Sequence, residues 1–203
     1  MQKKILNRNL IFFFIFFFIA SCSSVPKYPQ NACEIFGEKY FYLKYTRAAS
    51  KKWGVPISSI LAVINKESGF RRFAKPKKLK IFKIIPYRRP SSSLGFSQAV
   101  NKTWDLYKKE NNKPAALRIS YKSSSDFIGW YFWKANKINK VSLNNTRDLY
   151  LNYYLGFSAY KNKAYQTDKK AIIYAKSVEK QAKIYKSQLL ECKSILNKSY
   201  ITC

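Results

Sequence analysis

The chain has 203 residues, enough for one domain with a substantial hydrophobic core, and 47% of them are hydrophobic and 17% aromatic, which excludes a disordered chain. It contains no histidine, which removes Ser-His and Cys-His nucleophile pairs and every metal site that needs a histidine ligand. Ten carboxylates leave few candidates for acid–base chemistry, and a formal net charge of +29 predicts an anionic partner or surface.

The N-terminal residues are typical of a secretion signal. Lys3, Lys4 and Arg8 precede an apolar run over 10–20, which is too short to span a bilayer because a spanning helix takes about 20 residues. The small residues that precede Cys22 resemble the lipobox of bacterial lipoproteins, in which the cysteine is acylated and becomes the mature N-terminus. An ordinary signal peptide with an incidental cysteine is the alternative.

These features predict three segments: a signal peptide over 1–21, a tether over 22–30 and a single domain over 31–203. Ser23 follows the cysteine, which in such lipoproteins usually means sorting to the outer membrane. We therefore expect an outer-membrane lipoprotein that faces the periplasm and is held to the membrane by its lipid. In that compartment the anionic partners are the cell-wall polymer and lipid head groups, and a nucleic-acid role is disfavoured.

The cysteines also fit an oxidising compartment. A disulfide between Cys33 and Cys192 would tie the start of the domain to the end of its last helix. A disulfide between Cys192 and Cys203 would close only a small C-terminal loop. We favour the Cys33–Cys192 pair, and one thiol is left over in either case.

Helical periodicity dominates the rest of the chain. The spacing of apolar residues predicts helices over 34–53, 58–68, 126–138, 146–155 and 168–191. The last of these has one apolar stripe at spacings of three and four, which would pack onto the domain. A turn over 91–98 leads into a further helix through Trp104, Leu106 and Tyr107, which ends before the break at 111–114. The fold class is therefore mainly α, with a short β-hairpin expected within 79–90.

Glu67 is the strongest candidate for acid–base chemistry. It follows Ile64 by three residues, Val63 by four and Ile60 by seven, so on a helix its carboxyl lies at the end of an apolar stripe. Apolar surroundings raise the pKa of a carboxyl, as a general acid near neutral pH requires. The alternative is a glutamate at a helix end that is exposed or paired with a nearby arginine.

Two further blocks follow the Glu67-Ser68 pair in the sequence. A Gly-Phe-Ser-Gln turn covers 95–98, and a Tyr-Tyr-Leu-Gly segment covers 153–156. In order and spacing the three blocks resemble the soluble-lytic-transglycosylase (SLT) domain family, and the resemblance covers about residues 50–192. Phe96, Ser97 and Tyr154 depart from it, because they stand where Leu, Met and Asn are usual.

The resemblance implies a lysozyme-like helical fold and non-hydrolytic cleavage of the β-1,4 bond between N-acetylmuramic acid and N-acetylglucosamine in peptidoglycan. Glu67 would be the catalytic acid and then base, and the product would be a 1,6-anhydro sugar. Substrate contacts would come from Ser68, Gly95, Phe96, Gln98, Tyr153 and Tyr154. Ser68 would steady the helix end or the carboxylate, while Gln98 and Tyr153 would hold the acetamido group and orient Glu67. We expect no metal and no cofactor.

Other interpretations stay open. A goose-lysozyme-like hydrolase would need a positioned water, and Asp105 or Asp126 could approach Glu67 in space. A non-catalytic wall-binding lipoprotein would keep the groove without turnover. Tryptophans at 104, 130 and 133 could stack on sugar rings, but aromatic residues in helices more often belong to the core.

Residues 71–89 form a basic insert with nine lysine or arginine residues and interleaved apolar residues. We expect a flap over the glycan groove that attracts stem-peptide carboxylates or the membrane surface. A solvated loop is the alternative.

Overall fold

The structure is a computed structural model that describes residues 25–82 and 84–192. The predicted signal peptide, Cys22 and Cys203 lie outside the described residues. The helices are α2 (Ala32–Glu38), α3 (Tyr40–Trp53), α4 (Ile57–Ser68), α5 (Asn101–Glu110), α6 (Tyr121–Asn139), α7 (Thr146–Leu155), α8 (Phe157–Lys161), the 3-10 helix η2 (Ala164–Gln166) and α9 (Lys169–Glu191). Two short strands, β1 (Lys80–Ile81) and β2 (Ile85–Pro86), complete the fold. The predicted mainly α fold with one hairpin is confirmed.

Helix boundaries differ from the predicted ones in two places. The helix expected over 34–53 is divided at Lys39, whose backbone is not helical, with φ −124° and ψ 69°. Helix α6 begins five residues earlier than predicted, because Ser120 caps it by accepting a hydrogen bond from the backbone N–H of Ser123. The added first turn includes Ser124 and Ser125, which are fully buried.

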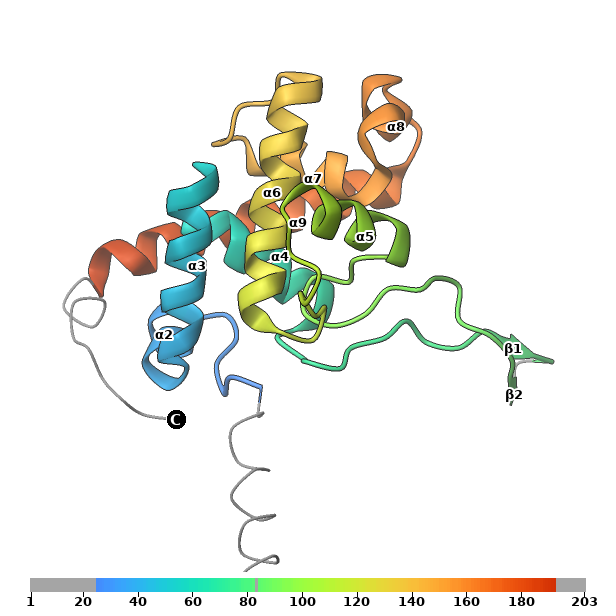
Figure 1. The fold of residues 1–203 in the computed structure, drawn as a ribbon, viewed down its shortest axis with the longest axis horizontal. Coiled ribbons are helices and arrows are strands. Elements are labelled where there is room, and N and C mark those ends of the chain that lie inside the picture. Colours follow the sequence, from blue (N-terminus) through green and yellow to red (C-terminus); the bar gives the residue numbers. More distant parts are fainter. Residues whose placement is uncertain (1–24, 83, 193–203) are drawn as a thin grey trace, which may run out of the picture.

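The core is built where long helices cross. Helix α3 packs along α6, and α9 packs against both α4 and α7 (Figure 1). Trp104 and Trp130 are 4% and 1% exposed, so both belong to this core and are not free to stack on sugars. Gly129 allows the close packing of α6 on α3, because a Cβ there would lie 2.5 Å from Cδ1 of Trp53.

The two ends of the described chain are fastened together. Cys33 and Cys192 form a disulfide with Cα atoms 6.0 Å apart, which is the pairing favoured by the sequence. Nearby, the Asn65 side-chain amide donates to the Tyr185 hydroxyl at 2.8 Å and to the Pro29 carbonyl at 3.2 Å. Residue 29, which the sequence places in the tether, is therefore fixed between α4 and α9.

The basic insert does not lie where it was expected. Its hairpin pairs Lys80 with Pro86 and Ile81 with Ile85, and it projects away from the helices (Figure 1). The base of the insert stays with the body, since the Ala74 carbonyl accepts a hydrogen bond from Gly95 N–H at 2.9 Å. The hairpin is therefore an arm and not a flap over the helical body.

None of the helices in the described part of the chain is both long enough and apolar enough to cross a membrane.

The disulfide generates a stability prediction. Replacing Cys33 and Cys192 together by serine removes a link between residues 159 apart, which restricts the unfolded chain. We expect the free energy of unfolding to fall by about 2–4 kcal/mol. Urea denaturation of the oxidised protein and the double variant measures this difference. Equal unfolding midpoints would contradict it.

Candidate active site

Helix α4 carries Glu67 to the edge of the core. Ile60, Val63 and Ile64 are fully buried on one face of this helix, and Glu67 is partly buried on the next turn of that face. The helix ends at once, because Gly69 adopts a left-handed conformation with φ 55° and its N–H bonds to the Asn65 carbonyl. The carboxyl therefore sits where an apolar face meets a helix terminus.

Helix α7 supplies the partner of this carboxyl. The Tyr150 hydroxyl donates a hydrogen bond to Glu67 Oε1 at 2.7 Å, and Tyr150 is itself 1% exposed. The beginnings of the two helices are also joined, since the hydroxyls of Ser59 and Thr146 lie 2.7 Å apart. Two separate contacts thus hold α4 against α7.

Burial dominates the protonation of Glu67. Loss of solvent raises its pKa from 4.5 to about 7, although the Tyr150 hydrogen bond and the Lys66 charge favour the ionised form and lower the pKa. A carboxyl with this pKa holds its proton in a large fraction of molecules near neutral pH. It can therefore donate that proton as an acid and take one back as a base.

Ser68, next to Glu67, has a structural role. It is 1% exposed, and its hydroxyl donates to the Ile64 carbonyl at 3.0 Å. This bond steadies the last turn of α4, which was one of the two roles expected for the residue. The hydroxyl is directed to the backbone and not to the carboxylate.

The two predicted tyrosines follow Tyr150 on α7 and have different roles. The Tyr153 hydroxyl donates to the Ser97 carbonyl, and burial followed by the nearby Glu67 charge raises the pKa of Tyr153. Tyr154 is 37% exposed, its ring centroid lies 6.3 Å from that of Tyr150, and it meets Tyr174 edge-on at 5.6 Å. Tyr153 is thus tied to the 95–98 turn, whereas Tyr154 offers an open aromatic surface.

The 95–98 turn is shaped by its backbone. Gly95 has φ 75°, and a Cβ there would lie 2.0 Å from the Arg118 carbonyl oxygen, so no other residue fits. Gln98 also has a positive φ, and its side-chain amide donates to the carbonyls of Gly95 at 2.8 Å and Ala74 at 2.9 Å. These bonds fix the turn against Ala74, in the segment that leads to the projecting hairpin.

The middle of the turn faces inward. Phe96 is 3% exposed and meets Tyr121 edge-on at 5.3 Å, so it belongs to the core and not to a substrate surface. Ser97 is fully buried, and its hydroxyl has no hydrogen-bond partner within the described residues. The residue that replaces the usual methionine therefore leaves a polar group unpaired beside Tyr153.

The two aspartates considered as second carboxylates are engaged elsewhere. Asp126 accepts hydrogen bonds from the Trp53 indole at 3.0 Å and from Tyr107 and Lys113 at 2.5 Å. Burial pushes the pKa of Asp126 up, but these bonds outweigh burial and hold the pKa below its ordinary value. Asp105 pairs with Lys108 at 3.0 Å on α5. Neither residue is among the groups that shift the pKa of Glu67.

Tyr150 is the residue that the sequence interpretation missed. It precedes Tyr153 by three residues and Tyr154 by four, so all three lie on neighbouring positions of one helical face. That spacing could have indicated Tyr150 as a further member of the site. Its pairing with Glu67, 83 residues away, depends on tertiary packing.

The fold and the site together define a helical domain in which the partly buried, protonatable Glu67 lies beside a tyrosine-rich helix. The sequence model of the transglycosylase SLT domain matches residues 10–192 of the chain. The chain therefore belongs to that family, as the three sequence blocks indicated. Membership supports a transglycosylase function in peptidoglycan turnover and implies that the domain binds peptidoglycan. No curated protein sequence matches the chain.

The raised pKa of Glu67 has a consequence for stability. This carboxyl has a pKa of 4.5 in the unfolded chain and of about 7 in the folded protein. Between these pH values the folded state therefore binds more protons than the unfolded state. The free energy of unfolding consequently falls as the pH rises from 4.5 to 7. Glu67→Gln removes this dependence. We expect the variant to match the wild type near pH 4 and to be more stable by about 1–3 kcal/mol above pH 7. Urea unfolding of both proteins across this pH range measures the difference, and parallel pH profiles would contradict the prediction.

Proposed function

We propose that the protein is a lytic transglycosylase that cleaves the bond between N-acetylmuramic acid and N-acetylglucosamine without water and releases 1,6-anhydro-muramoyl products. The single observation that carries this proposal is the Glu67 carboxyl, partly buried, hydrogen-bonded by Tyr150 and with a pKa of about 7. Family membership supplies the substrate class.

In the first step, protonated Glu67 gives its proton to the glycosidic oxygen while the bond from that oxygen to the muramoyl C1 breaks. In the second step, ionised Glu67 takes the proton of the muramoyl 6-hydroxyl as its oxygen bonds to C1. The carboxyl is thereby restored, and neither water nor a cofactor is consumed. Tyr150 orients Glu67 in both steps, and its hydrogen bond stabilises the ionised carboxylate formed between them.

One carboxylate is sufficient for this reaction, because groups of the substrate take the place of the second carboxylate that most glycosidases use. Among the described residues, the groups that shift the pKa of Glu67 are Tyr150 and Lys66, and no other carboxylate is among them. A hydrolase of the two-acid type would need a partner carboxylate to activate water. The surroundings of Glu67 therefore favour the lyase over the hydrolase.

Substrate contacts follow from the same geometry. Tyr154 and Tyr174 form an edge-on pair beside Tyr150, and we assign Tyr154 to stacking on a sugar ring. Gln98 and Tyr153 act by fixing the 95–98 turn against α7. Gly95 gives that turn its shape.

We also propose that the protein is an outer-membrane lipoprotein, acylated at Cys22 and exposed to the periplasm. The apolar run over 10–20, the small residues before Cys22 and Ser23 after it support this location. The Cys33–Cys192 disulfide suits an oxidising compartment. Metabolic labelling with a fatty acid, compared between wild type and Cys22→Ser, tests the acylation.

Mass spectrometry of fragments released from purified peptidoglycan tests the activity. We expect residues 23–203 to release anhydro-muropeptides and Glu67→Gln to release at least about 100-fold less, because the variant lacks the proton that the leaving oxygen needs. Glu34→Gln is the matched control, since Glu34 is an exposed glutamate on α2. It should retain full activity.

Three outcomes would contradict the proposal. Fragments with reducing ends would assign the protein to the muramidases. Equal release by the wild type and Glu67→Gln would remove Glu67 from the chemistry. Binding of folded wild-type protein to peptidoglycan without any release would indicate a wall-binding module.

A further inference from the structure

The arm, defined as residues 77–82 and 84–89, combines two kinds of exposed side chain. Every one of its residues is exposed. The sequence has no acidic residue between Glu67 and Asp105, so the arm carries uncompensated positive charge. Its basic residues are Lys77, Lys78, Lys80, Arg88 and Arg89. Its large apolar residues are Leu79, Ile81, Phe82, Ile84, Ile85 and Tyr87.

Strand pairing sorts these residues onto two faces. Ile81 lies opposite Ile85, and opposite residues of an antiparallel pair share a face. Tyr87 N–H bonds to the Leu79 carbonyl at 2.8 Å, which extends the same pairing by one step. The two-residue period of a strand then places Lys80 on the opposite face. The hairpin is therefore amphipathic, although it packs against no core.

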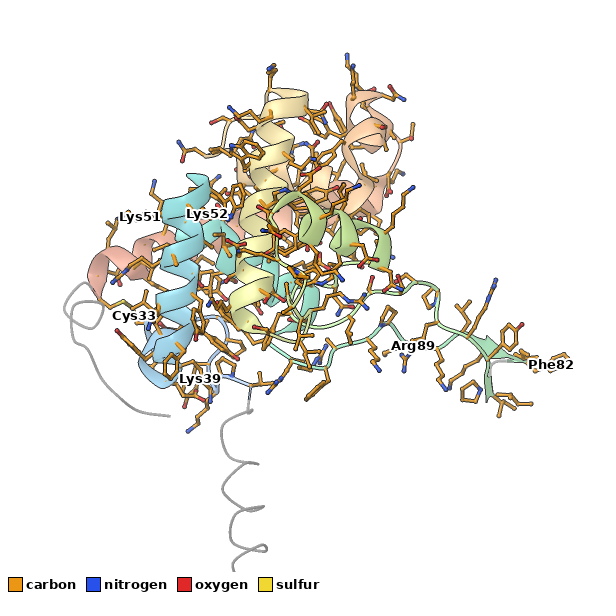
Figure 2. All side chains as sticks on the ribbon, viewed as in Figure 1. Cys33, Lys39, Lys51, Lys52, Phe82 and Arg89 are labelled. Atoms are coloured by element: carbon orange, nitrogen blue, oxygen red, sulfur yellow. A yellow bond between two sulfur atoms is a disulfide. The ribbon has the colours of Figure 1, made fainter. Side chains whose placement is uncertain are left out.

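The end of the hairpin is its most exposed apolar part. Phe82 is 87% exposed and Ile84 is 76% exposed. In Figure 2, Phe82 marks the far end of the arm and Arg89 lies nearer the helical body. Phe82 also has φ 50°, a backbone conformation that bulky residues rarely adopt. Folding gains no buried area from this phenylalanine, so its position is best explained by a partner outside the chain.

We propose that the arm inserts its apolar end into the interface of an anionic lipid bilayer while its basic residues contact the lipid head groups. Anionic lipids complement the charge of the arm, and the acyl chain boundary accepts the isoleucines and Phe82. A carboxylate-bearing glycan would satisfy the lysines and leave the apolar end in water. The paired strands satisfy part of their backbone hydrogen bonds internally, which lowers the cost of partial insertion.

This contact would set the height of the candidate active site above the membrane. At the base of the arm, the Ala74 carbonyl accepts bonds from Gly95 N–H and from the Gln98 amide. In the same turn, the Ser97 carbonyl accepts a hydrogen bond from the Tyr153 hydroxyl of α7. The arm is thus joined through one short turn to the helix that positions Tyr150. The proposal does not rest on catalysis by Glu67.

Vesicle sedimentation tests the proposal directly. Residues 23–203 contain the whole hydrophobic core, whose first member is Ala32, and lack the apolar N-terminal run and Cys22. We expect this protein to sediment with phosphatidylglycerol–phosphatidylethanolamine vesicles and not with phosphatidylcholine vesicles. Phe82→Trp should show fluorescence quenching by brominated acyl chains above the wild-type background. No quenching would overturn insertion.

Two variants separate the charged and apolar contributions. The triple change of Phe82, Ile84 and Ile85 to serine keeps every charge and should weaken vesicle binding by about tenfold or more. Reversal of Lys77, Lys78 and Lys80 to glutamate should weaken it by about tenfold or more at low salt, with a smaller loss at high salt.

Matched controls lie outside the arm, on helices α6 and α9 and on the connections between helices. Serine at Leu117, Ile138 and Ile173 removes apolar residues that are 58%, 47% and 63% exposed. Glutamate at Lys163, Lys176 and Lys180 makes the same change of net charge at exposed positions. Both controls should bind vesicles more tightly than the corresponding arm variants.

Besides the absence of quenching, two results would overturn the proposal. One is vesicle binding by the triple serine variant that equals that of the wild type. The other is a loss in the arm variants of binding to purified peptidoglycan while vesicle binding is unchanged, which would make the arm a wall-binding element. Because both results are read out as binding and not as cleavage, neither depends on the activity of Glu67.

Discussion

The hydrogen bond from Tyr150 to Glu67, made at the edge of an apolar core, is the interaction on which the rest of the site depends. Burial alone would favour the neutral carboxyl, and full exposure would favour the ionised one. Glu67 is partly buried and accepts the Tyr150 hydrogen bond, and these opposing effects give its carboxyl a pKa of about 7. The packing of α9 on both α4 and α7 keeps the two side chains together. The disulfide between Cys33 and Cys192 fastens the end of α9.

A second constraint acts through the 95–98 turn. Gly95 approaches the Arg118 carbonyl so closely that a side chain has no room, and the turn can then reach Tyr153 through the Ser97 carbonyl. The Gln98 amide joins the same turn to Ala74, at the base of the arm. The turn therefore links Tyr153 of α7 to the base of a projecting hairpin. A small change in the geometry of the turn would shift both Tyr153 and the base of the hairpin.

Local patterns were sufficient for much of this architecture. Helical spacing indicated that Glu67 ends an apolar stripe, and apolar residues interleaved with basic ones indicated the hairpin. Long-range contacts could not be predicted in the same way. The pairing of Tyr150 with Glu67 and the engagement of Asp126 by Lys113 join residues from different elements. Phe96 stands within a motif block but belongs to the core, which only its packing on Tyr121 reveals. The direction of the arm could not be predicted either, because its exposed residues have no packing pattern that points to the helical body.

The central claim is that the fold holds Glu67 protonated near neutral pH. The most direct measurement is a titration of the Glu67 side-chain carboxyl carbon by ¹³C NMR in the wild type and in Tyr150→Phe. The account predicts a pKa of about 7 for Glu67 in the wild type. It predicts a higher pKa in the variant, because the lost hydrogen bond favoured the ionised form. A pKa near 4.5 in both proteins would contradict the account.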